Sequence, residues 1–109
     1  MQDKLLFALS LCRKAGALVT GYDAVMECVN DGRAQLALCA ADAAERTARH
    51  TQDACAGRVE FCRMALTVQQ LSRITRKPTA VFAVTDRELA HLCRTCMPGQ
   101  TAAEKEERP

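Results

Sequence analysis

The chain contains few aromatic residues: it has no tryptophan, one tyrosine and three phenylalanines among 109 residues. Its hydrophobic core must therefore be mainly aliphatic, and 49% of the residues are hydrophobic. A chain of this length can bury such a core as one domain without disulfides or metal ions. Long apolar runs are also missing, since none approaches the roughly 20 residues of a membrane-spanning helix. The sequence thus predicts one domain that has no membrane partner.

A strong excess of charge of one sign is missing as well, because the formal net charge is only +2. The polar segment from Glu104 to Arg108 contributes −1, so the remainder of the chain carries +3. This weakly basic balance permits a nucleic-acid partner without requiring one.

The chain is rich in cysteine, but the seven cysteines form no disulfide framework, because their number is odd and their spacing does not repeat. Such usage is typical of a reduced, cytoplasmic chain in which cysteine serves as a small hydrophobic residue. Cys93 and Cys96 have the Cys-x-x-Cys spacing of a redox couple or half a zinc site. This pair falls near a predicted helix end and has no second pair, so we favour a structural role over a redox or metal site.

Hydrophobic periodicity and helix-stop signals predict nine alternating elements. Helices are expected over residues 3–15, 22–31, 42–56, 68–74 and 86–96, and strands over residues 17–19, 36–40, 59–64 and 79–85. This alternation predicts an α/β fold, a three-layer α/β/α sandwich with a mixed sheet of about four strands. Residues 1–97 form this domain, and the polar tail over residues 98–109 is expected to be disordered.

Several polar residues stand where helices need N-terminal caps. Asp42 with Glu45 and Thr67 with Gln70 have capping-box spacing, and Asp86 precedes the last helix. The two aspartates also follow buried strands, where paired carboxylates can perform acid–base or metal chemistry. We favour capping, and the sequence contains no glycine-rich nucleotide loop, nucleophile elbow or metalloprotease motif. We therefore expect no catalytic activity, no metal, no cofactor and no small-molecule substrate.

The most informative candidate site begins at Thr20 and Gly21, an exposed corner that starts the second predicted helix. The first turn of a helix presents unpaired backbone N–H groups and the positive end of the helix dipole, which attract anions. The inner face of this helix is expected to hold Val25, Cys28 and Val29, with Tyr22 as a further candidate.

Basic residues lie in two segments outside that helix. Arg13 and Lys14 end the first helix, and Arg73 precedes a basic loop at residues 75–78. Loops at one end of an α/β sandwich can converge, so these segments can form one phosphate-binding surface with the Thr20-Gly21 corner. Scattered surface charge is the alternative interpretation. No aromatic residue interleaves with the basic loop, so base stacking is not predicted there.

These segments are similar to a known family. The segments in question are Arg13-Lys14-Ala15-Gly16, Val19-Thr20-Gly21-Tyr22-Asp23-Ala24-Val25, Gly32-Arg33-Ala34-Gln35-Leu36, and Ala80-Val81-Phe82-Ala83-Val84-Thr85-Asp86. Over about residues 4–92, the chain resembles the kink-turn RNA-binding ribosomal proteins, of which large-subunit protein seven-Ae is one. Within that family it resembles the bacterial YlxQ-type branch.

The resemblance implies a non-catalytic RNA-binding protein of the cytoplasm that binds rRNA or another structured RNA and associates with the ribosome. In the family, the start of the second helix grips the sheared G·A pairs of a kink turn. The loop before the last strand covers an extruded nucleotide. The resemblance assigns RNA binding to Thr20, Gly21, Tyr22, Asp23, Ala24, Glu27, Thr75, Arg76, Lys77 and Pro78, with Arg13 and Lys14 as flanking contacts.

The chain departs from the family pattern at the centre of this site. Asp23 and Ala24 stand where strong binders carry Asn-Glu, and Glu27 stands where they carry lysine. An ionised Asp23 accepts hydrogen bonds but donates none, and Glu27 opposes a phosphate contact. The alternative hypothesis is therefore a protein-interaction module that kept the scaffold and lost specific RNA binding.

Overall fold

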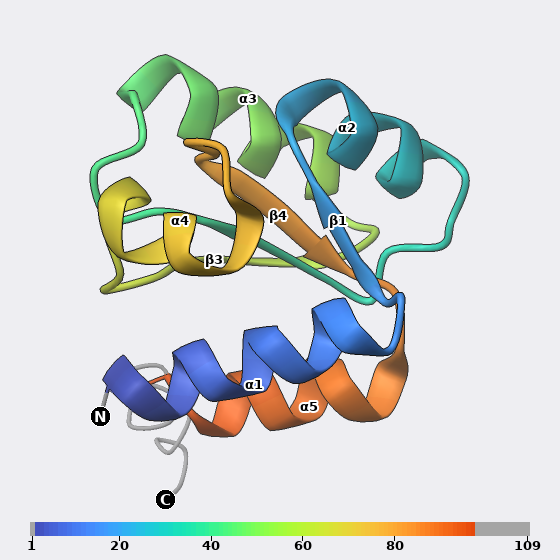
Figure 1. Cartoon of the computed structure of the whole chain (residues 1–109). Coiled ribbons are helices and arrows are strands. Elements are labelled where there is room, and N and C mark those ends of the chain that lie inside the picture. Colours follow the sequence, from blue (N-terminus) through green and yellow to red (C-terminus); the bar gives the residue numbers. More distant parts are fainter. Residues whose placement is uncertain (1, 98–109) are drawn as a thin grey trace, which may run out of the picture.

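The computed structural model describes residues 2–97, so the predicted tail over residues 98–109 lies outside the described residues. Five helices alternate with four strands in the predicted order (Figure 1). The helices are α1 Gln2–Lys14, α2 Tyr22–Asn30, α3 Glu45–Cys55, α4 Val68–Thr75 and α5 Arg87–Thr95. The strands are β1 Leu18–Thr20, β2 Leu36–Cys39, β3 Glu60–Arg63 and β4 Val81–Val84.

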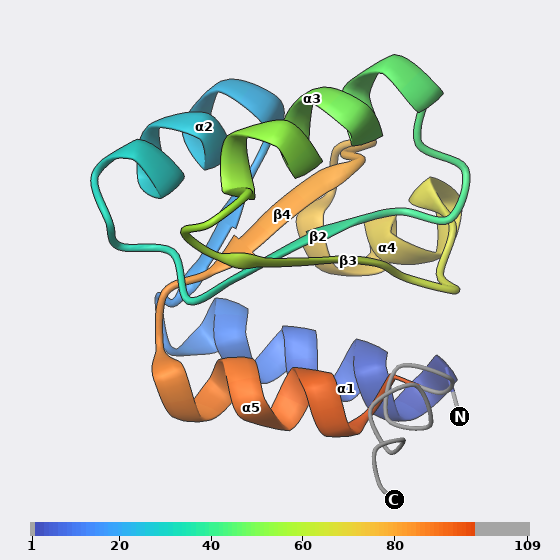
Figure 2. The ribbon, with the colours of Figure 1, turned by 180° about the vertical axis from the view of Figure 1, so that it is seen from behind.

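The four strands form one mixed sheet in the order β1-β4-β2-β3. β4 runs antiparallel to both of its neighbours, β1 and β2, whereas β2 and β3 are parallel. α2 and α3 cover one face of the sheet, while α1 and α5 cover the other (Figures 1 and 2). α4 packs with the α1–α5 side of the core. The predicted three-layer α/β/α sandwich with a four-stranded mixed sheet is confirmed.

The two central strands, β2 and β4, are buried on both faces, as their unbroken apolar runs indicate. Successive side chains alternate between the faces because the side-chain period of a strand is two residues. Leu36, Leu38 and Phe82 belong to the cluster that packs against α1, α4 and α5. The smaller Ala37 and Ala83 belong to the cluster beneath α2 and α3. The sheet therefore carries its bulkier side chains toward α1 and α5.

The role of Asp42 differs from the sequence prediction. Asp42 does not cap α3, which begins after Ala44 without a side-chain cap. Its Oδ1 instead accepts a hydrogen bond of 2.9 Å from the backbone N–H of Val68, the first residue of α4. The preceding backbone N–H, that of Ala41, donates to the carbonyl of Leu66, and this contact holds Asp42 beside the start of α4. The predicted capping box of Asp42 with Glu45 is therefore wrong.

The other two predicted caps are confirmed. Thr67 Oγ1 accepts from the backbone N–H of Gln70, and the Gln70 side chain accepts in return from the backbone N–H of Thr67. Asp86 accepts from the backbone N–H of Leu89 at the start of α5. Asp42 and Thr67 thus satisfy different donors in the first turn of α4, the helix that leads into the basic loop.

Replacing Asp42 by alanine is expected to lower the free energy of unfolding by about 1 kcal/mol, because the Val68 N–H loses its acceptor. Asp42→Asn, the matched control, keeps a side-chain oxygen and should retain most of the stability. Urea unfolding followed by circular dichroism measures both. Equal losses of unfolding free energy in the two variants would show that the hydrogen bond between Asp42 and Val68 does not stabilise the protein.

Candidate nucleic-acid interface

The start of α2 lies directly beside the end of the loop that precedes β4. The backbone N–H of Gly21 donates a 3.0 Å hydrogen bond to the carbonyl of Val81, which extends the antiparallel pairing of Thr20 with Phe82. Both segments stand at the same end of the sheet in Figure 1. Two segments far apart in the sequence therefore meet, because β1 and β4 are neighbours.

Gly21 gives α2 an open N-terminus. Its φ of 99° and ψ of 145° lie in a region that residues with a Cβ rarely adopt, so glycine is needed here. The first intrahelical bond of α2 runs from the Val25 N–H to the Gly21 carbonyl, and no side chain caps the helix. A Cβ built on Gly21 would meet no atom within 4 Å. The first-turn amides are therefore free of a side-chain cap and stand beside open space.

Local hydrogen bonds hold the backbone of the basic loop. α4 ends where Arg76 adopts φ 70°, the only positive φ of a non-glycine residue between residues 2 and 97. Its N–H donates to the Ser72 carbonyl. The Lys77 carbonyl accepts from Thr75 Oγ1 at 2.6 Å and from Thr79 Oγ1 at 3.2 Å. The hydroxyl of Thr75 therefore shapes the loop, and the loop enters β4 with a defined conformation.

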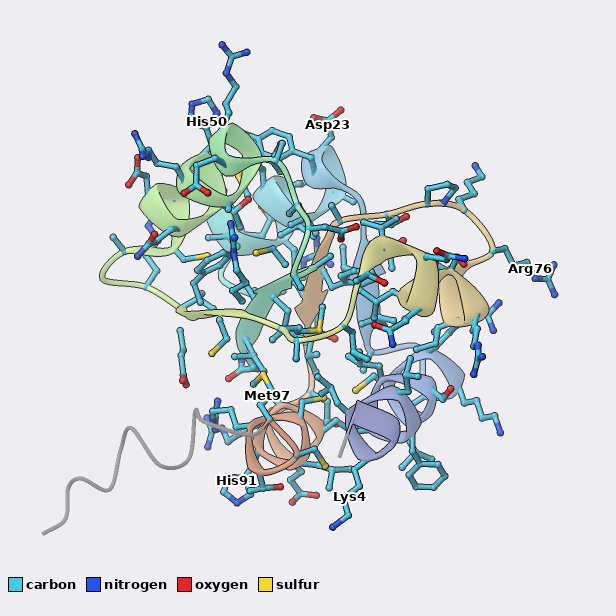
Figure 3. The ribbon with its side chains drawn as sticks, turned by 90° about the vertical axis from the view of Figure 1, so that its left-hand side faces the viewer. Lys4, Asp23, His50, Arg76, His91 and Met97 are labelled. Atoms are coloured by element: carbon cyan, nitrogen blue, oxygen red, sulfur yellow. The ribbon has the colours of Figure 1, made fainter. Side chains whose placement is uncertain are left out.

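The basic side chains of this loop are available for a ligand. Arg76, Lys77 and the neighbouring Arg73 are exposed, as is Pro78. The structure forms three ion pairs among the described residues, and none of them involves these cations. Figure 3 shows the Arg76 side chain pointing away from the body of the protein. Unpaired cations on a preformed loop are suited to phosphate oxygens.

The outer surface of α2 is acidic. Asp23, Ala24 and Glu27 are exposed, and the two carboxylates share a face because they are four residues apart. These carboxylates repel phosphate but can accept hydrogen bonds from base N–H groups. A polyanion would thus meet cations at the basic loop and acceptors along α2.

Tyr22 is the residue whose environment the sequence misjudged. Val25, Cys28 and Val29 are buried on the inner face of α2 as predicted, but Tyr22 is 40% exposed. It follows Gly21 directly, so it begins α2 beside the start of β4, the strand that follows the basic loop. The basic loop itself contains no aromatic residue, and it is the pairing of β1 with β4 that brings Tyr22 to the start of β4. Its exposed ring provides a surface on which a base can stack.

Arg13 and Lys14 lie away from this cluster. They end α1 before the turn into β1, where the Thr85 N–H, beyond the end of β4, donates to the Ala17 carbonyl. Gly21 stands at the opposite end of β1, and the intervening strand of three residues spans about 10 Å. The two basic segments therefore occupy opposite ends of β1 (Figure 1).

The Cys-x-x-Cys pair is built into the protein interior. Cys93 is fully buried with its Sγ 3.8 Å from Cys12 Sγ on α1, and Cys96 is half-buried. The contact with Cys12 and burial raise the pKa of the Cys93 thiol, whereas a reactive thiol needs a lowered pKa. Between residues 2 and 97, no group of three His, Cys, Asp or Glu side chains is placed to hold a metal ion. No helix in this range is long and apolar enough to span a bilayer.

Two solved structures share this fold. A protein with unknown function from Bacillus halodurans C is 29% identical, with a TM-score of 0.73 over 83% of this chain and 96% of that chain. The Giardia lamblia 15.5kD RNA binding protein is 23% identical, with a TM-score of 0.66 over 84% of this chain and 80% of that chain. No protein-family model matches the chain, and no curated protein matches its sequence.

Proposed function

We propose that this chain is a non-catalytic RNA-binding protein that holds structured RNA between the start of α2 and the basic loop. The observation that carries the proposal is the hydrogen bond from Gly21 to Val81, which joins an uncapped helix start to the first residue of the strand that follows the basic loop. The fold shared with an RNA-binding protein from Giardia lamblia supports it. Within this proposal, the RNA contains a kink turn, the chain is a relative of the YlxQ-type branch, and it acts on the ribosome in the cytoplasm.

In this proposal, different residues of the interface contact different parts of the RNA. Arg76 and Lys77 neutralise phosphates, while Tyr22 stacks on an unpaired base. Asp23 accepts hydrogen bonds from the N–H groups of a guanine edge. Since Asp23 and Glu27 are acidic, base edges rather than phosphates must face α2. Thr20 and Ala24 present small side chains beside the open Gly21, and the restricted ring of Pro78 helps to hold the loop shape.

The contacts at the far end of β1 are of a different kind. Arg13 and Lys14 lie about one strand length from Gly21, so only RNA that extends beyond the α2 start reaches them. We infer that they add phosphate contacts to a longer stem and carry no sequence information.

The test is a titration with three RNAs of equal length at several salt concentrations. The first contains a kink turn, the second replaces its sheared G·A pairs by Watson–Crick pairs, and the third is a straight duplex. We expect binding to the kink turn to be at least about tenfold tighter, because only bent RNA with exposed base edges satisfies Asp23 and Tyr22. Equal, weak and strongly salt-dependent binding to all three RNAs would mean that phosphate attraction alone explains the binding, and it would contradict specific recognition of a kink turn.

A protein-interaction module is the second candidate, and the exposed Asp23, Ala24 and Glu27 favour it. Purification of the tagged chain with and without nuclease separates the two candidates. Partners that remain after nuclease treatment, with no RNA in the untreated sample, would support the module.

A further inference from the structure

α1 carries a second apolar stripe besides the one that faces the core. Its inner face is buried in the core and consists of Leu5, Ala8, Leu9 and Cys12. Lys4, Phe7, Leu11 and Lys14 follow at spacings of three, four and three residues, so they lie along one line on another face of the helix. Phe7 is 65% exposed and Leu11 is half-buried. An apolar stripe of this kind on a helix that is already packed requires a separate explanation.

A groove between α1 and α5 adjoins this stripe. The two helices lie side by side beneath the sheet (Figures 1 and 2). The groove has a volume of about 300 Å³ and is lined by Lys4, Phe7, Ala8, Leu92 and Cys96. Apart from the Lys4 ammonium group these side chains are apolar, so the α1–α5 groove fits apolar side chains from a neighbouring molecule.

Charge is placed at both ends of the stripe. Lys4 and Lys14 are separated by roughly 15 Å along the helix axis, at 1.5 Å per residue. Both are exposed, and neither takes part in an ion pair among the described residues. A ligand that lies along α1 is therefore best matched when it carries carboxylates near its two ends and apolar groups between them.

We propose that the α1–α5 groove binds an amphipathic helix of a partner protein, with apolar side chains in the groove and carboxylates facing Lys4 and Lys14. In helix-in-groove recognition the bound helix presents apolar anchors at i, i+3, i+4 and i+7, which form one face that can enter the groove. Lys4 lies at the opposite end of the molecule from Asp23 (Figure 3). The partner helix therefore lies away from the start of α2 and the basic loop, and it shares only Lys14 with the contacts proposed for a longer RNA stem.

Other occupants fit this groove less well. Residues 98–109 of the chain contain no leucine, isoleucine, valine, methionine or aromatic residue, so they cannot fill it with large apolar groups. A second copy placed with its α1 antiparallel would bring Lys4 of each copy opposite Lys14 of the other, where like charges repel. A bilayer surface does not project into a groove between two helices, whereas a helix ridge does.

The probe is a synthetic helical peptide with leucines at i, i+3, i+4 and i+7 between two glutamates. Its control carries lysine in place of both glutamates. Titration into the full chain, followed by NMR amide shifts, should move resonances of α1 and α5 with a Kd on the order of tens of micromolar, as for a small transient interface. The lysine peptide should bind at least about tenfold more weakly. Equal binding of the two peptides, or shifts centred on α2 and the basic loop, would overturn the proposal.

Variants of the chain sharpen the test. Phe7→Ser should weaken the glutamate peptide about tenfold without unfolding the protein, since Phe7 is largely exposed. Lys4→Glu with Lys14→Glu should reverse the preference between the two peptides, while Arg49→Glu on the exposed side of α3 should change neither affinity. Two results would assign the groove to another occupant if the peptide does not bind. Binding to anionic phosphatidylglycerol vesicles that is lost in Phe7→Ser would assign it to a membrane. Concentration-dependent dimerisation that is lost in Phe7→Ser would assign it to a second copy. Either result would refute the partner helix.

Discussion

Phe82→Ala is expected to lower the free energy of unfolding by about 3–5 kcal/mol, a large part of the total stability of a domain of this size. Phe82 is 1% exposed and belongs to the larger core cluster, between the central strand β4 and the helices α1 and α5. Truncation removes its buried apolar surface and leaves a cavity that the flanking strands cannot fill. Equilibrium unfolding in urea, followed by circular dichroism, measures the loss as a lower midpoint.

The matched control for this variant is Phe7→Ala, the same chemical change at a side chain that is 65% exposed. Phe7 leaves no cavity when it is truncated, so its loss should remain within about 0.5 kcal/mol. Similar destabilisation by both variants would mean that Phe82 does not occupy the packed position described above. The control also shows whether the protein stays folded when Phe7 is replaced, as the binding experiments with Phe7 variants require.

Reversing the charge of the basic loop with Arg76→Glu and Lys77→Glu is expected to weaken binding of kink-turn RNA by about 100-fold. The RNA loses two phosphate contacts, and two negative charges that repel its phosphate backbone take their place. The dependence of log K on log salt should also become shallower by about two, one for each phosphate contact. Filter-binding or gel-shift titrations at several salt concentrations measure both quantities.

The control for overall charge is Lys4→Glu with Arg87→Glu, which changes the net charge by the same amount. Lys4 lies at the end of the molecule away from Asp23, and Arg87 begins α5 on the same side of the sheet as α1. We expect at most a threefold or so loss of RNA affinity, through long-range electrostatics alone. Equal losses in the two double variants would show that the basic loop has no special position at the RNA interface.

The sequence by itself determined the order and type of the elements in this protein. The apolar run from Leu36 and the run around Phe82 predicted strands, and both strands are fully buried. Thr67 with Gln70 predicted the start of α4. These predictions succeed because periodicity and capping depend on residues within one or two turns of each other. The α/β/α sandwich follows from the same local signals, since helices that alternate with buried strands must cover both faces of the sheet.

The sequence also identified the segments of the candidate interface, but it did not determine their relation in space. It grouped Arg13 and Lys14 with the basic loop on one possible surface, as flanking contacts, whereas the fold places them at the other end of β1. It assigned Asp42 to α3, although the aspartate accepts from Val68 of α4. It left Tyr22 as a candidate for the inner face, where the structure exposes it.

Only the tertiary structure decided which distant segments meet. The contact of Gly21 with Val81 exists because β1 joins the sheet beside β4, and no residue near either segment encodes that choice. The α1–α5 groove likewise exists only because α5 packs beside α1, since Leu92 of one helix and Phe7 of the other line it. Strand order and helix docking depend on how all apolar faces can be buried at once. They are properties of the whole chain, which the local pattern of residues does not contain.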